Sequence, residues 1–316
     1  MTHPSPRPSG RPLVVAHRGS SASAPENTLA AFEAALRAGA DLLELDVRLD
    51  GDGVPVVLHD ETLDRTTDRS GAVADLPSSA VRAADAGAWF SPAFAGQRVP
   101  TLREVVDLVA LHGSGGLLVE FKGTWSPAAV AGAVATLRTA GVAGRSVVQS
   151  FEVETVAALR DVAPDVRRAL LVLTPGSPPA PGALGQSLRD LAHDPFTALS
   201  TPVGQARAEA GRAVADLGVV AVNPYVGGLV ASPHVVAEYH AAGVATYPWT
   251  VDEPRLWADL LRHGVDGIIT DDPGRLRGFL DAREVRSSQD EALEDRRLLT
   301  LAATRQGAPA TGLTPV

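Results

Sequence analysis

Eight short apolar runs, separated by stretches with helical spacing, constrain the fold of this chain more than any other feature. The runs are nearly continuous in Val, Leu and Ile, which is typical of parallel strands buried on both faces. Eight such strands with crossover helices predict a closed TIM (β/α)8 barrel of the α/β class. In chain order the runs are Leu13–His17, Leu42–Val47, Leu117–Lys122, Ser146–Ser150, Arg168–Leu173, Val219–Asn223, Ala245–Thr250 and Gly267–Asp271.

A ninth strand pattern, Val54–His59, does not fit this alternation. It follows the extended stretch Leu42–Asp50 after only Gly51-Asp52-Gly53, whereas a parallel partner needs a crossover of a dozen or more residues. We therefore expect a hairpin that folds back on the second strand. With the turn near residue 52, His59 returns to about the level of Asp46. Residues 61–100 then form a small insertion before the next helix.

The stretches between the apolar runs show helical spacing of their apolar residues. Thr101 and Glu104 match the capping-box pattern, in which each side chain satisfies a backbone N–H group at the start of a helix. The predicted helices are Thr28–Arg37, Thr101–His112, Pro127–Ala140, Glu152–Ala163, Pro233–Ala242 and Glu253–His263.

Both ends of the chain differ in composition from the barrel segment, residues 13–280. Residues 1–12 are rich in Pro, Ser and Arg, and we expect a disordered arm and not a signal peptide. Residues 281–316 begin with a dense charge run, which favours an exposed helix followed by a disordered tail. No stretch reaches the roughly 18 apolar residues of a membrane helix, so we expect no transmembrane segment and a cytoplasmic location.

Composition excludes several kinds of site. The chain has no cysteine, so disulfide scaffolds, thiolate nucleophiles, zinc fingers and iron–sulfur clusters are excluded. A bound metal would have oxygen or imidazole ligands, which favours Mg²⁺, Ca²⁺ or Mn²⁺. The net charge of -9 argues against a nucleic-acid partner. Lys122 is the sole lysine among 28 basic residues, as expected for a position that arginine cannot fill.

Acidic residues gather at the carboxyl ends of the predicted strands, where TIM barrels carry their active sites. Glu44 and Asp46 are two residues apart and therefore point to the same face, and Glu120 comes from the adjacent strand. Three converging carboxylates suit a hard divalent cation. The alternative is a structural ion-pair network in which Glu44 and Asp46 pair with Arg48 and Lys122.

Two of the eight histidines, His17 and His59, fall at predicted barrel-mouth positions. Imidazole titrates near neutral pH, so the two suit a general acid and base, and the sequence does not order these roles. Arg18 offers a planar guanidinium to phosphate oxygens and Lys122 a compact charge, although either can form a plain salt bridge. Trp249 either walls a substrate pocket or fills the top of the barrel.

The order of these motifs carries a resemblance that covers about residues 13–280. The motifs are His17-Arg18-Gly19, Pro25-Glu26-Asn27-Thr28, Glu44-Leu45-Asp46-Val47, Val56-Val57-Leu58-His59-Asp60 with Leu63 and Arg65-Thr66-Thr67, Pro100-Thr101-Leu102, Glu120-Phe121-Lys122, Ser150-Phe151, Trp249-Thr250-Val251 and Thr270-Asp271-Asp272-Pro273. Together they resemble the glycerophosphodiester phosphodiesterase family. One departure is Asp252, where the family more often has Asn.

The resemblance implies a metal-dependent enzyme that hydrolyses small-molecule glycerophosphodiesters to glycerol 3-phosphate and an alcohol. It implies one divalent cation, Mg²⁺ or Ca²⁺ with Mn²⁺ as a third candidate. The implied roles are metal binding by Glu44, Asp46 and Glu120, acid–base catalysis by His17 and His59, and substrate or phosphate binding by Arg18, Lys122 and Trp249.

Two alternatives use the same barrel. One is a lysophospholipase D-like or sphingolipid head-group phosphodiesterase. The other is a barrel that binds phosphodiesters without catalysis, although binding alone needs no acid–base pair. The sequence leaves the oligomeric state open.

Overall fold

The computed structural model describes residues 10–172 and 214–285. The chain divides into two compact units, Met1–Leu276 and Arg277–Val316. In the second unit the described residues, 277–285, are helical. Most of the predicted N-terminal arm, residues 1–9, and most of the predicted tail, residues 286–316, lie outside the described residues.

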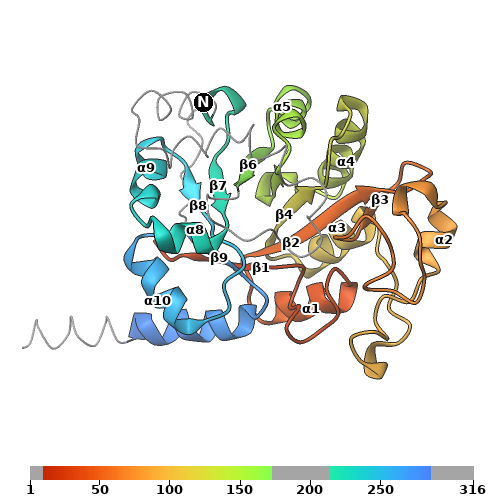
Figure 1. Ribbon diagram of the computed structural model, residues 1–316, viewed down its shortest axis with the longest axis horizontal. Helices are drawn as coiled ribbons and strands as arrows, with labels where there is room; N and C mark the ends of the chain where they lie inside the picture. Colours follow the sequence, from red (N-terminus) through yellow and green to blue (C-terminus); the bar gives the residue numbers. More distant parts are fainter. Residues whose placement is uncertain (1–9, 173–213, 286–316) are drawn as a thin grey trace, which may run out of the picture. The chain divides into compact units, whose positions relative to one another are not determined.

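The first unit is a nearly closed barrel of eight parallel strands with helices around it (Figure 1), which confirms the predicted TIM barrel. The barrel strands follow each other in the order β8-β7-β6-β5-β4-β2-β1-β9, so most sequence neighbours are also spatial neighbours. They are β1 (Leu13–Ala16), β2 (Leu42–Leu49), β4 (Gly116–Phe121), β5 (Val147–Ser150), β6 (Arg167–Val172), β7 (Ala221–Pro224), β8 (Ala245–Thr246) and β9 (Gly267–Thr270).

Single backbone hydrogen bonds close the barrel between β8 and β9. The N–H of Asp266 donates to Thr246 O at 3.0 Å, and the N–H of Ile269 donates to Pro248 O at 3.0 Å. Pro248 has no N–H group and cannot donate in return, which limits a regular ladder here. On its other edge β9 pairs parallel with β1, with Ala16 level with Thr270. The residues after these two strands therefore meet at the barrel mouth.

The predicted hairpin is present after β2. β3 (Pro55–Val57) pairs antiparallel with the end of β2, with Val47 opposite Val57. The next N–H, that of Leu58, donates to Asp46 O at 3.0 Å. His59 consequently lies at about the level of Asp46, as predicted from a turn near residue 52.

The insertion that follows has its own small core beneath the hairpin. It contains a short helix, α2 (Ser78–Arg82), and two 3-10 turns, η1 (Val73–Asp75) and η2 (Pro92–Phe94). Val56 and Leu58 of the hairpin contribute to this core together with six buried side chains of the insertion, Leu63, Val73, Val81, Ala84, Ala86 and Val99. This core fixes the loop that carries residues 59–65 against the barrel.

Most helices around the strands match the predicted positions within two residues. Thr28 caps the first of them by accepting from the N–H of Ala31, and the capping box of Thr101 and Glu104 opens α3. A helix that the sequence did not predict is the short α8. The helices are α1 (Leu29–Arg37), α3 (Leu102–His112), α4 (Pro127–Thr139), α5 (Val153–Val162), α8 (Val226–Ala231), α9 (Val235–Ala241) and α10 (Pro254–Arg262), with a 3-10 turn η3 (Ala143–Arg145). Among the described residues, no helix is both long and apolar enough to cross a membrane.

Candidate active site

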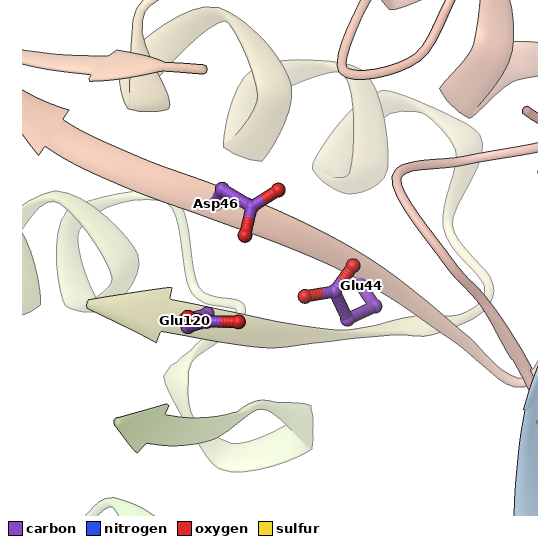
Figure 2. Close-up of side chains that lie close together, drawn as sticks. All are labelled: Glu44, Asp46 and Glu120. Atoms are coloured by element: carbon purple, nitrogen blue, oxygen red, sulfur yellow. The ribbon is translucent and has the colours of Figure 1, made fainter. Parts of the chain in front are cut away.

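Three buried carboxylates meet at the mouth of the barrel (Figure 2). Glu44 and Asp46 project from the same face of β2, and Glu120 projects from the neighbouring strand β4, where it is level with Asp46. Each side chain offers an oxygen within 4.8 Å of the others. Their exposed fractions are 2%, 1% and 7% in that order.

The electrostatics of this cluster leave negative charge uncompensated. Burial and the charges of Asp46 and Glu120 raise the pKa of Glu44 well above its usual value. Burial alone would also raise the pKa of Asp46, but Lys122 and other nearby cations hold it well below its usual range. A divalent cation would supply the missing charge, and carboxylate oxygens are the ligands that hard cations prefer. The residues present therefore fit a divalent metal.

Lys122 lies inside the cluster and not at its rim. Its ammonium is 2.7 Å from Glu120 Oε1 and 3.4 Å from Asp46 Oδ1, and its side chain is only 12% exposed. Arg48, which the alternative ion-pair network required, points elsewhere: its Nε donates to the carbonyl of His59 at 2.9 Å. The cations that contact the acidic cluster are therefore Lys122 and Arg18, and not Arg48.

Arg18 covers the other side of the acidic cluster from a tight turn after β1. Its backbone N–H donates to Glu44 Oε2 at 3.0 Å, and its guanidinium lies 3.3 Å from Asp46 Oδ2. Arg18 has a left-handed backbone, with φ of 54°. The next residue, Gly19, has φ of 86°, and a Cβ there would lie 2.6 Å from the backbone of Ala31. Only glycine fits this turn, which places the Arg18 N–H against Glu44.

His17, the residue after β1, is held by the carboxylate of the residue that follows β9. Its Nδ1 is 2.6 Å from Asp271 Oδ1, so the ring donates there and leaves Nε2 for another partner. Ser21 also donates to Asp271 Oδ1, at 2.8 Å. Asp252 Oδ1 in turn accepts from the backbone N–H of Asp271 at 2.8 Å. The ring of His17 is thus fixed by partners from distant parts of the chain.

His59, after the hairpin, has the same arrangement with a different partner. Its Nδ1 is 2.7 Å from Oδ1 of Asp60, the next residue. Burial lowers the pKa of His59, while the charge of Asp46 and the hydrogen bond with Asp60 oppose that change. Each of the two predicted histidines therefore has its Nδ1 on a carboxylate and its Nε2 available.

Trp249 belongs to an aromatic cluster at the ends of β5 and β7. Its ring packs edge to face with Phe151, at 5.6 Å between centroids, and with Tyr225, at 5.4 Å. Its indole N–H donates to Asn223 O at 2.8 Å. The hydroxyl of the next residue, Thr250, lies 3.5 Å from His17 Nδ1. The tryptophan therefore lies beside the His17 side of the mouth, and it is only partly buried.

Residues 17–275 match the family model described as the glycerophosphoryl diester phosphodiesterase family. The chain belongs to the glycerophosphoryl diester phosphodiesterase family. The match spans all of the residues whose geometry is described above and most of the barrel unit. The resemblance expected from the sequence motifs is thereby confirmed, and the chain is a phosphodiesterase of this class.

Relatives within this phosphodiesterase family are similar along nearly their whole length. A glycerophosphodiester phosphodiesterase of Caldanaerobacter subterraneus subsp. tengcongensis is 34% identical over 268 residues, which are 84% of this chain and 96% of the relative. A putative glycerophosphodiester phosphodiesterase of Bacillus subtilis is 34% identical over 261 residues, or 82% of this chain and 94% of the relative. These similarities cover the barrel as a whole and not a single motif.

A solved phosphodiesterase structure has the same fold. It is the Oleispira antarctica enzyme in complex with the product sn-glycerol-3-phosphate, with a TM-score of 0.70 and 26% sequence identity. The comparison covers 86% of this chain and 97% of that one.

Several polar partners in this phosphodiesterase site were not assigned from sequence. The sequence motifs gave Asn27 no role of its own, yet its side-chain amide donates to Asp46 Oδ2 at 2.8 Å from the turn just before α1. Asp271 and Asp60 belong to the sequence motifs of the resemblance, but neither was assigned a partner. The signal that could have found Asp271 is barrel closure, because closure makes the last strand a neighbour of the first.

Proposed function

We propose that this enzyme hydrolyses glycerophosphodiesters to glycerol 3-phosphate and an alcohol, with a divalent cation and a pair of histidines. The observation that carries the proposal is the pair His17 and His59, each oriented by a carboxylate, beside three buried acids that fit a cation. A relative of the same fold has been solved with sn-glycerol-3-phosphate as its product, which supports the same substrate class here.

Glu44, Asp46 and Glu120 would hold the cation, which is Mg²⁺, Ca²⁺ or Mn²⁺ by the preference of hard ions for carboxylate oxygens. When bound, such a cation neutralises negative charge on the phosphate that is attacked. Asn27 keeps the carboxylate of Asp46 oriented through its amide N–H.

The two histidines would exchange protons with the substrate and water through their Nε2 atoms. One imidazole takes the proton of the attacking hydroxyl, which belongs to the glycerol or to water, and the other protonates the leaving alcohol. Attack by water gives glycerol 3-phosphate directly. Attack by the glycerol hydroxyl gives a cyclic phosphate, which a water molecule then opens to glycerol 3-phosphate with the two imidazoles in exchanged roles. Asp271 and Asp60 accept from the Nδ1 atoms, so each ring keeps one tautomer. The negative charge of each carboxylate also stabilises the imidazolium form of its histidine. Neither ring then needs to reorient during the reaction.

Arg18, Lys122 and Trp249 would bind the rest of the substrate. The Arg18 guanidinium presents several donors in one plane, which suits two phosphate oxygens, and Lys122 adds a compact positive charge. The partly exposed ring of Trp249, on the His17 side of the mouth, offers an apolar surface to the carbon atoms of the substrate.

The test is turnover of glycerophosphocholine by His17→Ala and His59→Ala variants, with Mg²⁺, Ca²⁺ and Mn²⁺ supplied in turn. Loss of a general acid or base should lower kcat by about 10²- to 10⁴-fold. His112→Ala is the matched control, since that ring is exposed on α3 and bonds Ser114. Near wild-type turnover by either mouth variant would contradict its role, and activity that resists EDTA would contradict the metal.

The same assay separates the alternatives that use this barrel. Faster turnover of lysophosphatidylcholine than of glycerophosphocholine would favour a lysophospholipase D-like enzyme. Tight binding of either compound with the metal present but without turnover would favour a binding protein.

A further inference from the structure

Arg65 lies outside the acidic cluster, in the insertion after β3, and holds two carboxylates at once. Its Nε and Nη2 donate to the two oxygens of Asp60, at 2.7 and 2.9 Å. Its Nη1 and Nη2 donate to the two oxygens of Glu26, at 2.8 Å each. Four charge-assisted hydrogen bonds from one guanidinium form a rigid planar bridge between the two acids.

Each of these acids continues to a residue of the proposed mechanism. Asp60 Oδ1 accepts from His59 Nδ1 at 2.7 Å, and Glu26 Oε1 accepts from Arg18 Nη1 at 2.8 Å. A continuous path of hydrogen bonds therefore runs from the imidazole of His59, through Arg65, to the guanidinium of Arg18.

Charge along this path keeps the acids ionised. Burial would raise the pKa of Asp60, but hydrogen bonds from His59 and Arg65 hold it far below its ordinary value. The pKa of Glu26 is also lowered, because hydrogen bonds and charges of Arg65 and Arg18 outweigh burial. An ionised Asp60 can only accept, so it selects the His59 tautomer with the proton on Nδ1.

We propose that Arg65 is a positioning residue that fixes the His59 imidazole and the Arg18 guanidinium relative to each other across the mouth. The inference rests on the roles of His59 and Arg18 under the proposed function. Without Arg65, the imidazole of His59 would be the only partner in the path that Asp60 keeps. Asp60 lies on the loop that follows β3. The acid could then rotate, and the imidazole would lose its fixed orientation.

A second arginine of the insertion provides a matched control. Arg82 also makes a bidentate pair, with Glu104, at 2.7 and 2.9 Å. Its side chain is 40% exposed and that of Arg65 is 45% exposed. Glu104 belongs to the capping box of α3 and bonds neither proposed catalytic histidine. Loss of Arg82 thus removes a similar clamp and leaves the active site unchanged.

The experiment compares Arg65→Ala, Arg65→Lys and Arg82→Ala in turnover of glycerophosphocholine with the divalent metal that gives the highest activity. Loss of a group that orients a functional side chain typically costs about 10- to 100-fold, which is the fall in kcat expected for Arg65→Ala. Arg65→Lys should also be impaired, because one ammonium cannot make four planar bonds. Arg82→Ala should keep wild-type kcat and lose thermal stability.

Chemical rescue separates positioning from general stability. Because Arg65 is 45% exposed, its removal leaves a site open to solvent. Millimolar guanidinium should then restore part of the kcat of Arg65→Ala, with no gain for wild type or Arg82→Ala. A double variant, Arg65→Ala with Asp60→Asn, should lose less activity than the product of the two single losses, because both changes break the same link between Arg65 and Asp60.

The outcomes distinguish this inference from the proposed function. The positioning role would be overturned by a wild-type kcat for Arg65→Ala. It would also be overturned by a loss of kcat that guanidinium does not restore and that Arg82→Ala shows to the same extent. In either case an inactive His59→Ala would still support the proposed mechanism. An active His59→Ala would instead overturn the proposed function itself.

Discussion

At the scale of single residues, the two proposed catalytic imidazoles are held in the same way by carboxylates of different origin. His59 uses its sequence neighbour Asp60, whereas His17 uses Asp271, which lies 254 residues away. In both cases the carboxylate fixes the tautomer and leaves Nε2 for the reaction. The enzyme thus needs a closed barrel for one histidine and only a local loop for the other.

Asp271→Asn should lower kcat by about 10- to 100-fold with little change in KM, because an amide can no longer stabilise the imidazolium of His17. The matched control is Asp252→Asn at the neighbouring carboxylate. Asp252 Oδ1 accepts from the hydroxyl of Thr270 and the N–H of Asp271, and an amide oxygen can accept both. Steady-state kinetics should show wild-type turnover for Asp252→Asn, and equal losses in both variants would contradict a specific role for Asp271.

Asp252→Asn should also stabilise the protein in a pH-dependent way. Burial and the charge of Asp271 raise the pKa of Asp252, so the folded chain binds a proton that the unfolded chain has already released. The contribution of Asp252 to the stability of the wild type is therefore present below the ordinary carboxyl pKa, about 3.9, and is lost as pH rises through the raised folded value. Urea unfolding at pH 4 and pH 7 should show a larger gain for Asp252→Asn at pH 7. A gain that is the same at both pH values would contradict the raised pKa.

Sequence reasoning at this scale identified the residues whose position within a strand fixes their direction. Glu44 and Asp46 share a face because side chains alternate along a strand, and His59 follows from the hairpin register. Asp271 and Arg65 could not be assigned in this way. The first depends on closure of the barrel between its ends, and the second on how the insertion folds over the mouth.

At the scale of elements, the pattern of apolar runs was sufficient for all eight barrel strands and for the hairpin. The turn around Gly51-Asp52-Gly53 fixed the pairing of β2 with β3, because a two-strand register follows from its turn. The short helix α8 was missed, since Val226–Ala231 has six residues and two of them are glycine. Such a helix forms through packing at the barrel and leaves little local signal.

Thr101→Ala should lower the free energy of unfolding by about 1 kcal/mol, because the Thr101 hydroxyl caps α3 by accepting from the N–H of Glu104. Thr139→Ala is the matched control: this hydroxyl is exposed near the end of α4 and bonds a carbonyl of its own helix, that of Ala135. Its loss should cost less than about 0.5 kcal/mol. Chemical denaturation measures both, and equal losses would show that the capping box contributes no special stability.

At the scale of the whole molecule, the barrel combines an apolar interior with a strongly acidic mouth. The interior cluster contains Val15, Leu118 and Ile269 from three of the strands, all buried. Above it lie three buried acids with Lys122 as the ammonium that pairs with two of them. Like charges that are buried together destabilise a fold unless a cation neutralises them. We therefore expect the acids that bind the cation to lower the stability of the metal-free enzyme.

Glu44→Gln should make the metal-free protein more stable than wild type and should remove the stabilisation by metal. The amide removes a charge that burial, Asp46 and Glu120 all disfavour. Conversely, a cation at a hundredfold excess over its Kd adds about 2.7 kcal/mol to wild type, which is several degrees in Tm for a chain of this size. Thermal unfolding in EDTA and in excess Mg²⁺, Ca²⁺ or Mn²⁺ measures both effects.

Glu33→Gln is the control for the change in net charge, since Glu33 is exposed on α1 and forms an ion pair with Arg37, far from the acidic cluster in sequence. It should leave both the metal-free Tm and the metal-induced shift at wild-type values. If Glu44→Gln kept the full metal-induced shift in Tm, the cation would bind elsewhere. If the metal-free variant were less stable than wild type, the Glu44 carboxylate would be a structural partner of Arg18 and not a metal ligand. The metal-free Tm and the metal-induced shift in Tm thus separate a metal site from an ion-pair network, the two interpretations that the acidic motif allows.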